Sequence, residues 1–352
     1  PDSKAGSSSY TAALYLPKAG KRSTLIPTVN GSEELEDAQY VLLSNTQEPV
    51  VVALISVRIP ASGVQPQREE QRLLRFDDSG KLVSQVAIGV IDGVLRTATD
   101  STAAVAVGGV DSNANSGGVG IGFSLADGSE KWRASNEQDV HGIGGALGGS
   151  EDVLFSFVQV EVPGESYPAD ALRARDVDSG AVKWTKTLKE LTGRASGRVE
   201  VGKLGKGLAF LGIDGYEGHL TMAFRNADGT PVSPKLDTLF YDAVANQVVG
   251  GADRRATDEW TVGMSVTNAD NGAMVYSIPL EQANALELSL FGTANSKIWA
   301  TTTDEHVVLD ASTGKTLETG WTTYPAAAGP GWMLMAKGES YQKTYTISVQ
   351  RS

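Results

Sequence analysis

The chain reads Leu125-Ala126-Asp127-Gly128-Ser129-Glu130-Lys131-Trp132 at one point and Arg175-Asp176-Val177-Asp178-Ser179-Gly180-Ala181-Val182-Lys183-Trp184 further on. In both stretches a short segment reaches an aspartate, a turn closes on glycine, and tryptophan follows four residues after that glycine. Aspartate caps such turns through its side chain, and glycine adopts the positive φ that other residues resist. The pattern predicts two β-strands joined by a tight turn.

The same turn recurs along the chain. Four further copies are Phe76-Asp77-Asp78-Ser79-Gly80, Asn226-Ala227-Asp228-Gly229, Asn268-Ala269-Asp270-Asn271-Gly272 and Asp310-Ala311-Ser312-Thr313-Gly314. Successive glycines of the six turns are 42 to 52 residues apart. A repeat of about 40 to 50 residues with four strands is typical of a β-propeller blade. The sequence therefore predicts an all-β fold built from four-stranded antiparallel blades.

Pairs of β-rich segments predict the number of blades. The first segments of the pairs cover residues 50–58, 103–107, 153–157, 208–213, 247–251, 297–301 and 332–336, and the second segments cover 71–76, 120–125, 172–176, 220–225, 261–267, 306–310 and 345–349. Seven pairs predict a seven-bladed β-propeller. Six turns leave the last blade without outer strands, so the unassigned segments 10–16 and 40–43 predict a ring closed by N- and C-terminal strands in one blade. Eight blades are the alternative, if residues 25–43 form more of a sheet.

Residues 10–352 are predicted to form this single propeller domain, and residues 1–9 a flexible polar leader. The leader resembles the tether that follows the lipidated cysteine of bacterial lipoproteins, which implies a lipid anchor upstream of Pro1. A cleaved signal peptide or a cloning boundary explains the same residues equally well.

The composition of the 352 residues excludes several classes of site. Cysteine is absent, which excludes disulfides, thiolate catalysis and cysteine-ligated metals. The formal net charge of −12 disfavours binding to nucleic acid and to anionic lipid surfaces. No apolar run approaches the ~20 residues that span a bilayer. The folded domain is therefore not expected to insert into a membrane directly.

The two tryptophan-bearing turns resemble the pyrroloquinoline-quinone-like (quinoprotein-like) repeat, in which a glycine is followed four residues later by tryptophan. Gly272 has Tyr276 at that position, whereas Gly80 and Gly229 have serines. Propellers with these repeats resemble the lipoprotein of the bacterial outer-membrane assembly machinery. The resemblance implies an extracytoplasmic protein of the cell envelope, periplasmic or at the surface. It implies a non-catalytic scaffold, an accessory subunit or lipoprotein, that binds another envelope protein or a membrane complex through one propeller face.

No catalytic, cofactor or metal site is assigned from the sequence. His141, His219 and His306 fall in different repeats, and none has the i, i+4 partner or the nearby constellation of carboxylates that zinc or acid–base sites require. They are predicted to be structural. Residues 176–180 resemble the start of a calcium loop but lack its later glutamate. Quinoprotein dehydrogenases commonly carry a vicinal cysteine pair at the cofactor, which this chain cannot supply, so quinone binding is disfavoured. Two alternatives stay open: a hydrolase or lyase with a central-channel site, and a carbohydrate-binding propeller.

Connections between the paired segments predict where a partner binds. They are long at residues 60–70, 108–119 and 161–171, and equivalent connections of a propeller emerge on one face, opposite the Asp-Gly turns. Such insertions mark a binding surface in many proteins, although surface insertions are also tolerated without a function. The predicted partner contacts are Arg68, Glu69, Glu70, Glu165, Tyr167, Tyr216, Arg254, Arg255 and Trp260.

Three of the six tryptophans can be assigned a role. Trp132 and Trp184 occupy the aromatic position of the repeat and are predicted to pack between neighbouring blades. Trp260 lies next to Arg254, Arg255 and Asp258 in a polar segment, which makes it the tryptophan best suited to contact a partner.

Overall fold

The computed structural model describes residues 12–16, 21–43, 50–107, 119–134, 148–215, 218–251, 262–329, 332–337 and 346–350. These ranges contain 28 β-strands and two short helices, α1 (Leu188–Thr192) and α2 (Leu280–Ala285). Strands that neighbour each other in a sheet also follow each other in the chain, so each sheet is a simple meander. The predicted all-β class with four-stranded antiparallel sheets is confirmed.

Seven sheets of three or four strands can be traced in the described residues, in addition to a hairpin of two strands. The hairpin consists of β1 (Ala12–Leu16) and β2 (Lys21–Leu25). The first three sheets contain β3 (Glu34–Leu43), β4 (Val50–Ile59), β5 (Arg68–Phe76) and β6 (Leu82–Ile88); β7 (Gly93–Ala98), β8 (Thr102–Val107), β9 (Val119–Ser124) and β10 (Glu130–Arg133); and β11 (Gly148–Ser150), β12 (Val153–Val160), β13 (Ala169–Asp176) and β14 (Val182–Thr187). The next four contain β15 (Arg198–Gly205), β16 (Leu208–Gly215) and β17 (Gly218–Arg225); β18 (Thr238–Asp242), β19 (Gln247–Gly251), β20 (Val262–Asn268) and β21 (Met274–Pro279); β22 (Ser289–Ala294), β23 (Lys297–Thr301), β24 (His306–Asp310) and β25 (Thr316–Thr319); and β26 (Tyr324–Gly329), β27 (Trp332–Lys337) and β28 (Thr346–Gln350).

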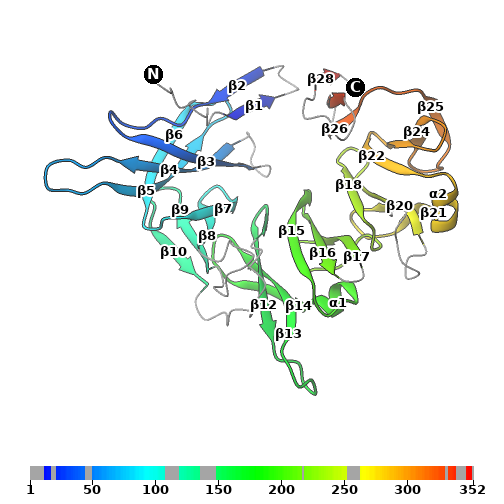
Figure 1. Cartoon of the computed structure of the whole chain (residues 1–352), viewed down its shortest axis with the longest axis horizontal. Coiled ribbons are helices and arrows are strands. Elements are labelled where there is room, and N and C mark those ends of the chain that lie inside the picture. The colour runs from blue at the N-terminus through cyan, green and yellow to red at the C-terminus, as the bar shows by residue number, and fades with distance from the viewer. Residues whose placement is uncertain are drawn as a thin grey trace, which may run out of the picture. The chain divides into compact units, whose positions relative to one another are not determined.

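The chain divides into two compact units. The first contains residues 1–158 and 174–182, with the β1–β2 hairpin and the sheets β3–β6 and β7–β10. The second contains residues 159–173 and 183–352, with the four sheets from β15 to β28. The boundary between the units falls within β12, β13 and β14. Figure 1 labels most of these elements, and their colour advances from blue to red along the chain.

The middle strands of the sheets are buried, whereas last strands such as β10 and β25 are largely exposed. In β4, Val52, Ala53 and Ile55 are each 0% exposed, although successive side chains of a strand point to opposite faces. All four residues of β25 are exposed. A middle strand that is buried on both faces needs another packed layer on each side of its sheet.

Consecutive sheets supply those layers within each unit. In the first unit Val52 and Leu54 belong to the same apolar cluster as Val105 of the next sheet. In the second unit Val249 of β19 belongs to one cluster with Ile298 of β23. The first strands of successive sheets also adjoin, since β7 contacts β3 and β11, and β22 contacts β18 and β26. This stacking is consistent with β-propeller blades, and a closed ring is not found in the described part of the chain.

The six predicted turns follow the third strands of their sheets, and their glycines have φ between 66° and 79°. The turn after β24 shows how such a turn is held. Asp310 Oδ1 accepts hydrogen bonds from the backbone N–H groups of Ser312 and Thr313 at 2.9 and 2.8 Å. The backbone N–H of Gly314 donates to the Asp310 carbonyl at 2.8 Å. Because glycine adopts this positive φ without strain, the turn closes tightly.

The predicted position of the paired segments within a sheet is wrong. Each segment expected to begin a blade is the second strand of its sheet, because a further strand precedes it. In the second sheet β7 comes first and pairs with β8, with Gly93 opposite Val107 and Ala98 opposite Ala103. The sequence of β7 includes Arg96 and carries no turn motif, so the recurring pattern did not reveal it.

Within the described ranges, the predicted blade shared by the two chain ends is not found. Residues 12–16 form β1, which pairs with β2 so that Ala12 lies opposite Leu25. Residues 40–43 belong to β3, the first strand of the β3–β6 sheet. Pairing with a segment nearby in sequence closes a much shorter loop than pairing with the distant C-terminal strand, and this lowers its entropic cost. Residues 10 and 11 lie outside the described part of the chain.

The connections predicted to be long are shorter in the structure. Strand β5 begins at Arg68, so the connection from β4 covers residues 60–67. Strand β13 begins at Ala169, so the connection from β12 covers residues 161–168. Residues 108–118 lie outside the described part. None of the helices in the described ranges has the length and apolar character needed to cross a membrane.

Candidate functional site

A groove of about 1180 Å³ lies in the second unit. Residues 160–170, which form the end of β12, its connection to β13 and the start of β13, provide most of the lining. The remaining lining residues come from β14, from α1 and from the segment after α1, namely Thr185, Thr187, Lys189, Glu190, Ala195 and Ser196. Both the β12–β13 connection and α1 are in the green part of the chain in Figure 1. The groove therefore combines segments that are brought together by one sheet and its following helix.

A tight turn and two prolines shape the β12–β13 connection. The backbone N–H of Glu165 donates to the Val162 carbonyl at 3.1 Å, and Gly164 between them has φ of 88°. Pro163 and Pro168 have no N–H group with which to continue a strand ladder. Residues 163–168 are all exposed. The connection therefore leaves the sheet and exposes its side chains along the groove.

A capping box holds α1 at the groove. The Thr187 hydroxyl oxygen accepts the backbone N–H of Glu190 at 3.1 Å, and Glu190 Oε2 accepts the backbone N–H of Thr187 at 2.7 Å. The hydrogen bonds that the backbone N–H and the hydroxyl of Thr187 donate to the Glu190 carboxylate lower its pKa. The buried side chains of Leu188 and Leu191 anchor the helix to the protein interior. Lys189 and Glu190 are consequently held on its exposed side.

The groove carries an excess of negative charge. Four carboxylates and one ammonium group line it, namely Glu161, Glu165, Asp170, Glu190 and Lys189. Lys189 Nζ lies 3.6 Å from Glu165 Oε1. Asp170 is half-buried, accepts a long hydrogen bond of 3.4 Å from Gln159, and has a pKa raised by burial.

An exposed aromatic ring adjoins these charges. The Tyr167 residue is 83% exposed, and it lies between Ser166 and Pro168 in the groove lining. Val160, Val162 and Pro163 add further apolar surface to the same lining. A tyrosine ring that remains in water can bury apolar area against a ligand while its hydroxyl stays hydrated.

Two of the predicted partner contacts, Glu165 and Tyr167, lie together at this groove. Their contact with a partner stays a prediction. Arg68, Glu69 and Glu70 lie at the start of β5 in the first unit. The structure does not describe Tyr216, Arg254, Arg255 and Trp260, so these four predictions lie outside the described residues.

Glu70 has a structural contact in the first unit. It accepts a 2.6 Å hydrogen bond from Nε of Arg72, whose other two nitrogens each donate to Glu33 at 2.8 Å. Arg72 is 7% exposed, so the two carboxylates compensate a nearly buried guanidinium. Glu70 is therefore less available for a partner than its place at a strand end suggests.

The sequence-based prediction missed three groove residues, Asp170, Lys189 and Glu190. A signal for the last two is present, because Thr187-Leu188-Lys189-Glu190 has the capping-box pattern that starts a helix. Asp170 has no comparable local signal. Its place at the groove depends on where β13 rejoins the sheet.

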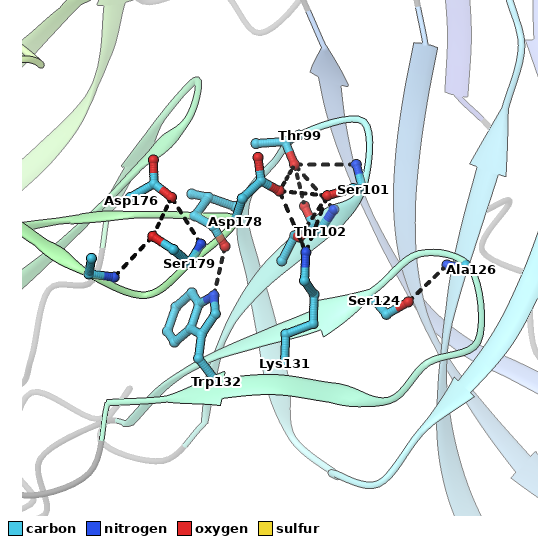
Figure 2. Close-up of polar contacts among 12 residues, drawn as sticks. Thr99, Ser101, Thr102, Ser124, Ala126, Lys131, Trp132, Asp176, Asp178 and Ser179 are labelled. Carbon is cyan, nitrogen blue, oxygen red and sulfur yellow. Dashed lines mark hydrogen bonds and ion pairs between the residues drawn. The ribbon is translucent and has the colours of Figure 1, made fainter.

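The predicted packing of Trp132 and Trp184 is confirmed. Trp132 Nε1 donates to the Val177 carbonyl at 2.7 Å in the turn region after β13, as the dashed line from its indole ring shows in Figure 2. In the second unit Trp184 Nε1 donates to the Asn226 carbonyl at 2.9 Å. Both indoles join one sheet to the next turn of the repeat, and they are not free to stack on a ligand.

Asp178 in the calcium-like segment is bound by protein groups. Its Oδ1 accepts hydrogen bonds from the hydroxyls of Thr99 and Ser101 at 2.6 and 2.7 Å, and Lys131 Nζ lies 3.9 Å away (Figure 2). Burial raises the pKa of Asp178, but these hydrogen bonds outweigh it and the net shift is downward. In the residues that the structure describes, no group of three or more His, Asp or Glu side chains is placed to hold a metal ion.

His219 has one carboxylate neighbour. Its Nδ1 lies 2.6 Å from Asp214 Oδ1 and its Nε2 lies 2.8 Å from Thr221 Oγ1. The register of β16 and β17 places Asp214 opposite His219, which spacing along the chain does not reveal. Thr221 is 8% exposed and its hydroxyl also donates to the Asp237 carbonyl at 3.2 Å. The hydroxyl is thus held inside the sheet and is poorly placed to attack a substrate.

His306 also has a structural environment. Its ring lies 4.5 Å from the Trp321 ring, and its Nδ1 lies 2.9 Å from the Trp321 carbonyl. Trp321 Nε1 in turn donates to the carbonyls of Ala300 and Val307 at 3.0 Å. His141 lies outside the described residues.

Comparisons with known proteins do not assign a family. No protein-family model and no curated protein matches the chain. A crystal structure of a eukaryotic initiation factor has a TM-score of 0.48 and 12% identity, covering 97% of this chain and 93% of that one. The β-propeller domain of the trilobed protease from Pyrococcus furiosus has a TM-score of 0.37 and 10% identity, covering 92% and 96%. An exotype rhamnogalacturonan lyase has a TM-score of 0.41 and 13% identity, covering 96% and 67%. Similarities this weak identify neither a family nor an activity.

Proposed function

We propose that this chain is a seven-bladed β-propeller of pyrroloquinoline-quinone-like repeats that serves as a non-catalytic binding scaffold in the cell envelope. The groove between the β12–β13 connection and α1 is the observation that carries this proposal. The scaffold holds a segment of another envelope protein or of a membrane complex in that groove. An N-terminal lipid anchor upstream of Pro1 belongs to the same proposal.

The lining of the groove favours binding over catalysis. The lining residues that the structure describes include no histidine. The carboxylates of Glu165 and Glu190 already have partners in Lys189 and Thr187. Catalysis of acyl transfer or hydrolysis needs a nucleophile beside a base, or two carboxyl groups set across a substrate. The exposed connection offers instead a long open surface with one aromatic residue.

Two observations favour a second candidate, a glycan hydrolase or lyase. Burial raises the pKa of Asp170, as a general acid requires, and exposed Tyr167 could hold a sugar ring. This candidate predicts turnover of an oligosaccharide, whereas the scaffold predicts a stoichiometric protein partner without turnover.

Site-specific photo-crosslinking separates the two functions. A photoreactive phenylalanine analogue replaces Tyr167 in one variant and Leu317 in a control, because Leu317 is also exposed but lies in β25. In cells that carry the native partner, the scaffold predicts a discrete cross-linked protein from position 167 and none from position 317. Turnover on a panel of glycans and esters without a cross-link at position 167 would favour the enzyme and remove the scaffold.

A further inference from the structure

We infer that the groove takes a positively charged protein segment, one that carries lysine or arginine side chains together with an apolar side chain. This inference rests on the proposed binding function and specifies the chemistry of the partner. It draws on three separate features of the groove, which are its charge, its exposed ring and its internal ion pair.

Charge complementarity is the first feature. Asp170 is half-buried, and in the described part of the chain its carboxylate accepts a single long hydrogen bond, of 3.4 Å, from the neutral amide of Gln159. Glu161 is exposed at the other end of the same connection. A cationic side chain would compensate both carboxylates, and the chain as a whole, at −12, attracts cations at long range. An anionic segment would meet repulsion from the same groups.

The exposed ring of Tyr167 is the second feature. A cation above an aromatic ring is attracted to its face, and arginine stacks on such rings especially well. The adjacent Pro168 and the nearby Val162 offer apolar surface for one aliphatic or aromatic side chain of the segment. A wholly hydrophilic polycation would leave this surface uncovered, which is why we include an apolar side chain in the partner.

The ion pair of Lys189 with Glu165 is the third feature. It joins exposed side chains, 69% and 46% accessible, across 3.6 Å. Pairs of this kind contribute little to stability and exchange readily with other charges. The ammonium group of Lys189 therefore occupies a place that a lysine or arginine of the partner can take. Removing Lys189 should strengthen the binding of a cation, an effect that a merely structural residue would not produce.

The experiment compares two synthetic peptides, three repeats of Lys-Leu-Arg-Ser and three repeats of Glu-Leu-Asp-Ser, by isothermal titration with the full chain. We expect the basic peptide to bind and the acidic peptide not to bind. Raising the sodium chloride concentration from roughly 20 mM to roughly 300 mM should weaken binding of the basic peptide about tenfold, because salt screening shortens the range of the attraction between exposed charges.

Variants with matched charge changes locate the binding surface. The double variant Glu161→Gln/Asp170→Asn should bind the basic peptide about five- to tenfold more weakly than the wild type. The control Glu281→Gln/Glu305→Gln changes the net charge by the same amount at exposed positions outside the groove lining. Its affinity for the basic peptide should stay within about twofold of that of the wild type. Lys189→Gln should strengthen binding about two- to threefold. Circular dichroism of each variant establishes that it is folded.

Equal binding of both peptides, equal losses in the groove and control double variants, or weaker binding of the basic peptide by Lys189→Gln would each overturn the inference. Failure of the basic peptide to bind would overturn it as well. Selective binding of chitohexaose in place of the basic peptide, lost in Tyr167→Ala, would assign the groove to a sugar. If the basic peptide fails while position 167 still cross-links a protein, the scaffold stands and only the charge assignment fails. Failure of both experiments removes the scaffold as well.

Discussion

Trp184 lies directly against Gly229, the glycine of the next turn in the repeat. A Cβ atom added at Gly229 would stand 3.1 Å from the indole ring, and the indole Nε1 donates to the Asn226 carbonyl at the start of the same turn. Trp132 has the same relation to Gly180 in the first unit. At both turns glycine is therefore favoured for two reasons: the backbone has a positive φ, and the preceding tryptophan lies where a Cβ atom would stand.

Gly180→Ala should destabilise the protein by about 2–4 kcal/mol, because it combines a positive φ with a Cβ atom 2.6 Å from Trp132 Cγ. Gly207→Ala is the matched control, since Gly207 has φ of 67° and no atom within 4 Å of the added Cβ. The control should cost about 1 kcal/mol from backbone strain alone. Urea denaturation measures both values, and equal costs would show that the tryptophan contact contributes nothing.

Trp184→Phe should cost about 1–2 kcal/mol, because the Asn226 carbonyl loses the indole donor while most apolar contact is kept. Trp184→Ala should cost about 3–5 kcal/mol, because Trp184 also packs edge-on against Phe224 with ring centroids 5.8 Å apart. Thermal unfolding of both variants tests the order. A phenylalanine variant as stable as the wild type would contradict a role for the hydrogen bond.

Glu33 should make stability depend on acid pH. The hydrogen bonds from Arg72 lower the pKa of Glu33 from its usual 4.5 to about 2. A folded-state pKa below the unfolded value stabilises the protein above pH 4.5, and this contribution is lost as pH falls from 4.5 towards 2. Glu33→Gln should therefore lower the free energy of unfolding at pH 7 by about 1–2 kcal/mol. It should also flatten the acid branch of the curve of stability against pH.

The control for this pH dependence is Glu69→Gln, which removes an exposed carboxylate on the same sheet. It should leave the acid branch of the stability curve unchanged. Denaturation curves between pH 7 and pH 2 supply the comparison. An unchanged acid branch in Glu33→Gln would show that the pair with Arg72 does not control it.

Thr187→Ala should cost about 1 kcal/mol, because it removes one half of the capping box of α1. Amide hydrogen exchange at residues 188–192 should accelerate, while the strands of the preceding sheet, β11 to β14, keep their protection. Thr319→Ala in exposed β25 is the control and should alter neither quantity. Protection at residues 188–192 equal to that of the wild type would mean that the buried leucines alone hold the helix.

Asp178→Asn should lower stability by about 1 kcal/mol, because it weakens the hydrogen bonds from Thr99 and Ser101 and removes the charge near Lys131. Calcium should leave the melting temperature of the wild type unchanged, since protein donors already occupy this carboxylate. Differential scanning fluorimetry with and without millimolar calcium tests this. A calcium-dependent rise that disappears in the variant would establish an ion at Asp178.

Local patterns made much of the fold predictable. The turn at Asp310 to Gly314 depends on a capping carboxylate and a glycine within five residues, so the sequence shows it directly. The fully buried segments of β4 and β8 are continuous apolar runs and were equally visible. Apart from part of β3, the first strands of the sheets were missed, because strands such as β7 mix polar and apolar residues and carry no turn motif.

The candidate site was predictable only in part. Glu165 and Tyr167 were found because a long connection between two strands stands out along the chain. Asp170, Lys189 and Glu190 join them through the return of β13 and the folding of α1 beside it, which no local pattern describes. The sequence-based prediction placed partner contacts on several connections. Two of these contacts, Glu165 and Tyr167, lie at the groove, and both belong to the connection between β12 and β13.

The repeat of turns and the aromatic position four residues after glycine follow from sequence alone, since each depends on a few neighbouring residues. Tertiary structure decided which strand begins each sheet, that β1 pairs with β2, and that Asp214 meets His219 across a hairpin. These relationships depend on the register and the order of pairing between strands. The free energies of alternative pairings differ through packing and loop closure over many residues, so no short stretch of sequence reveals them.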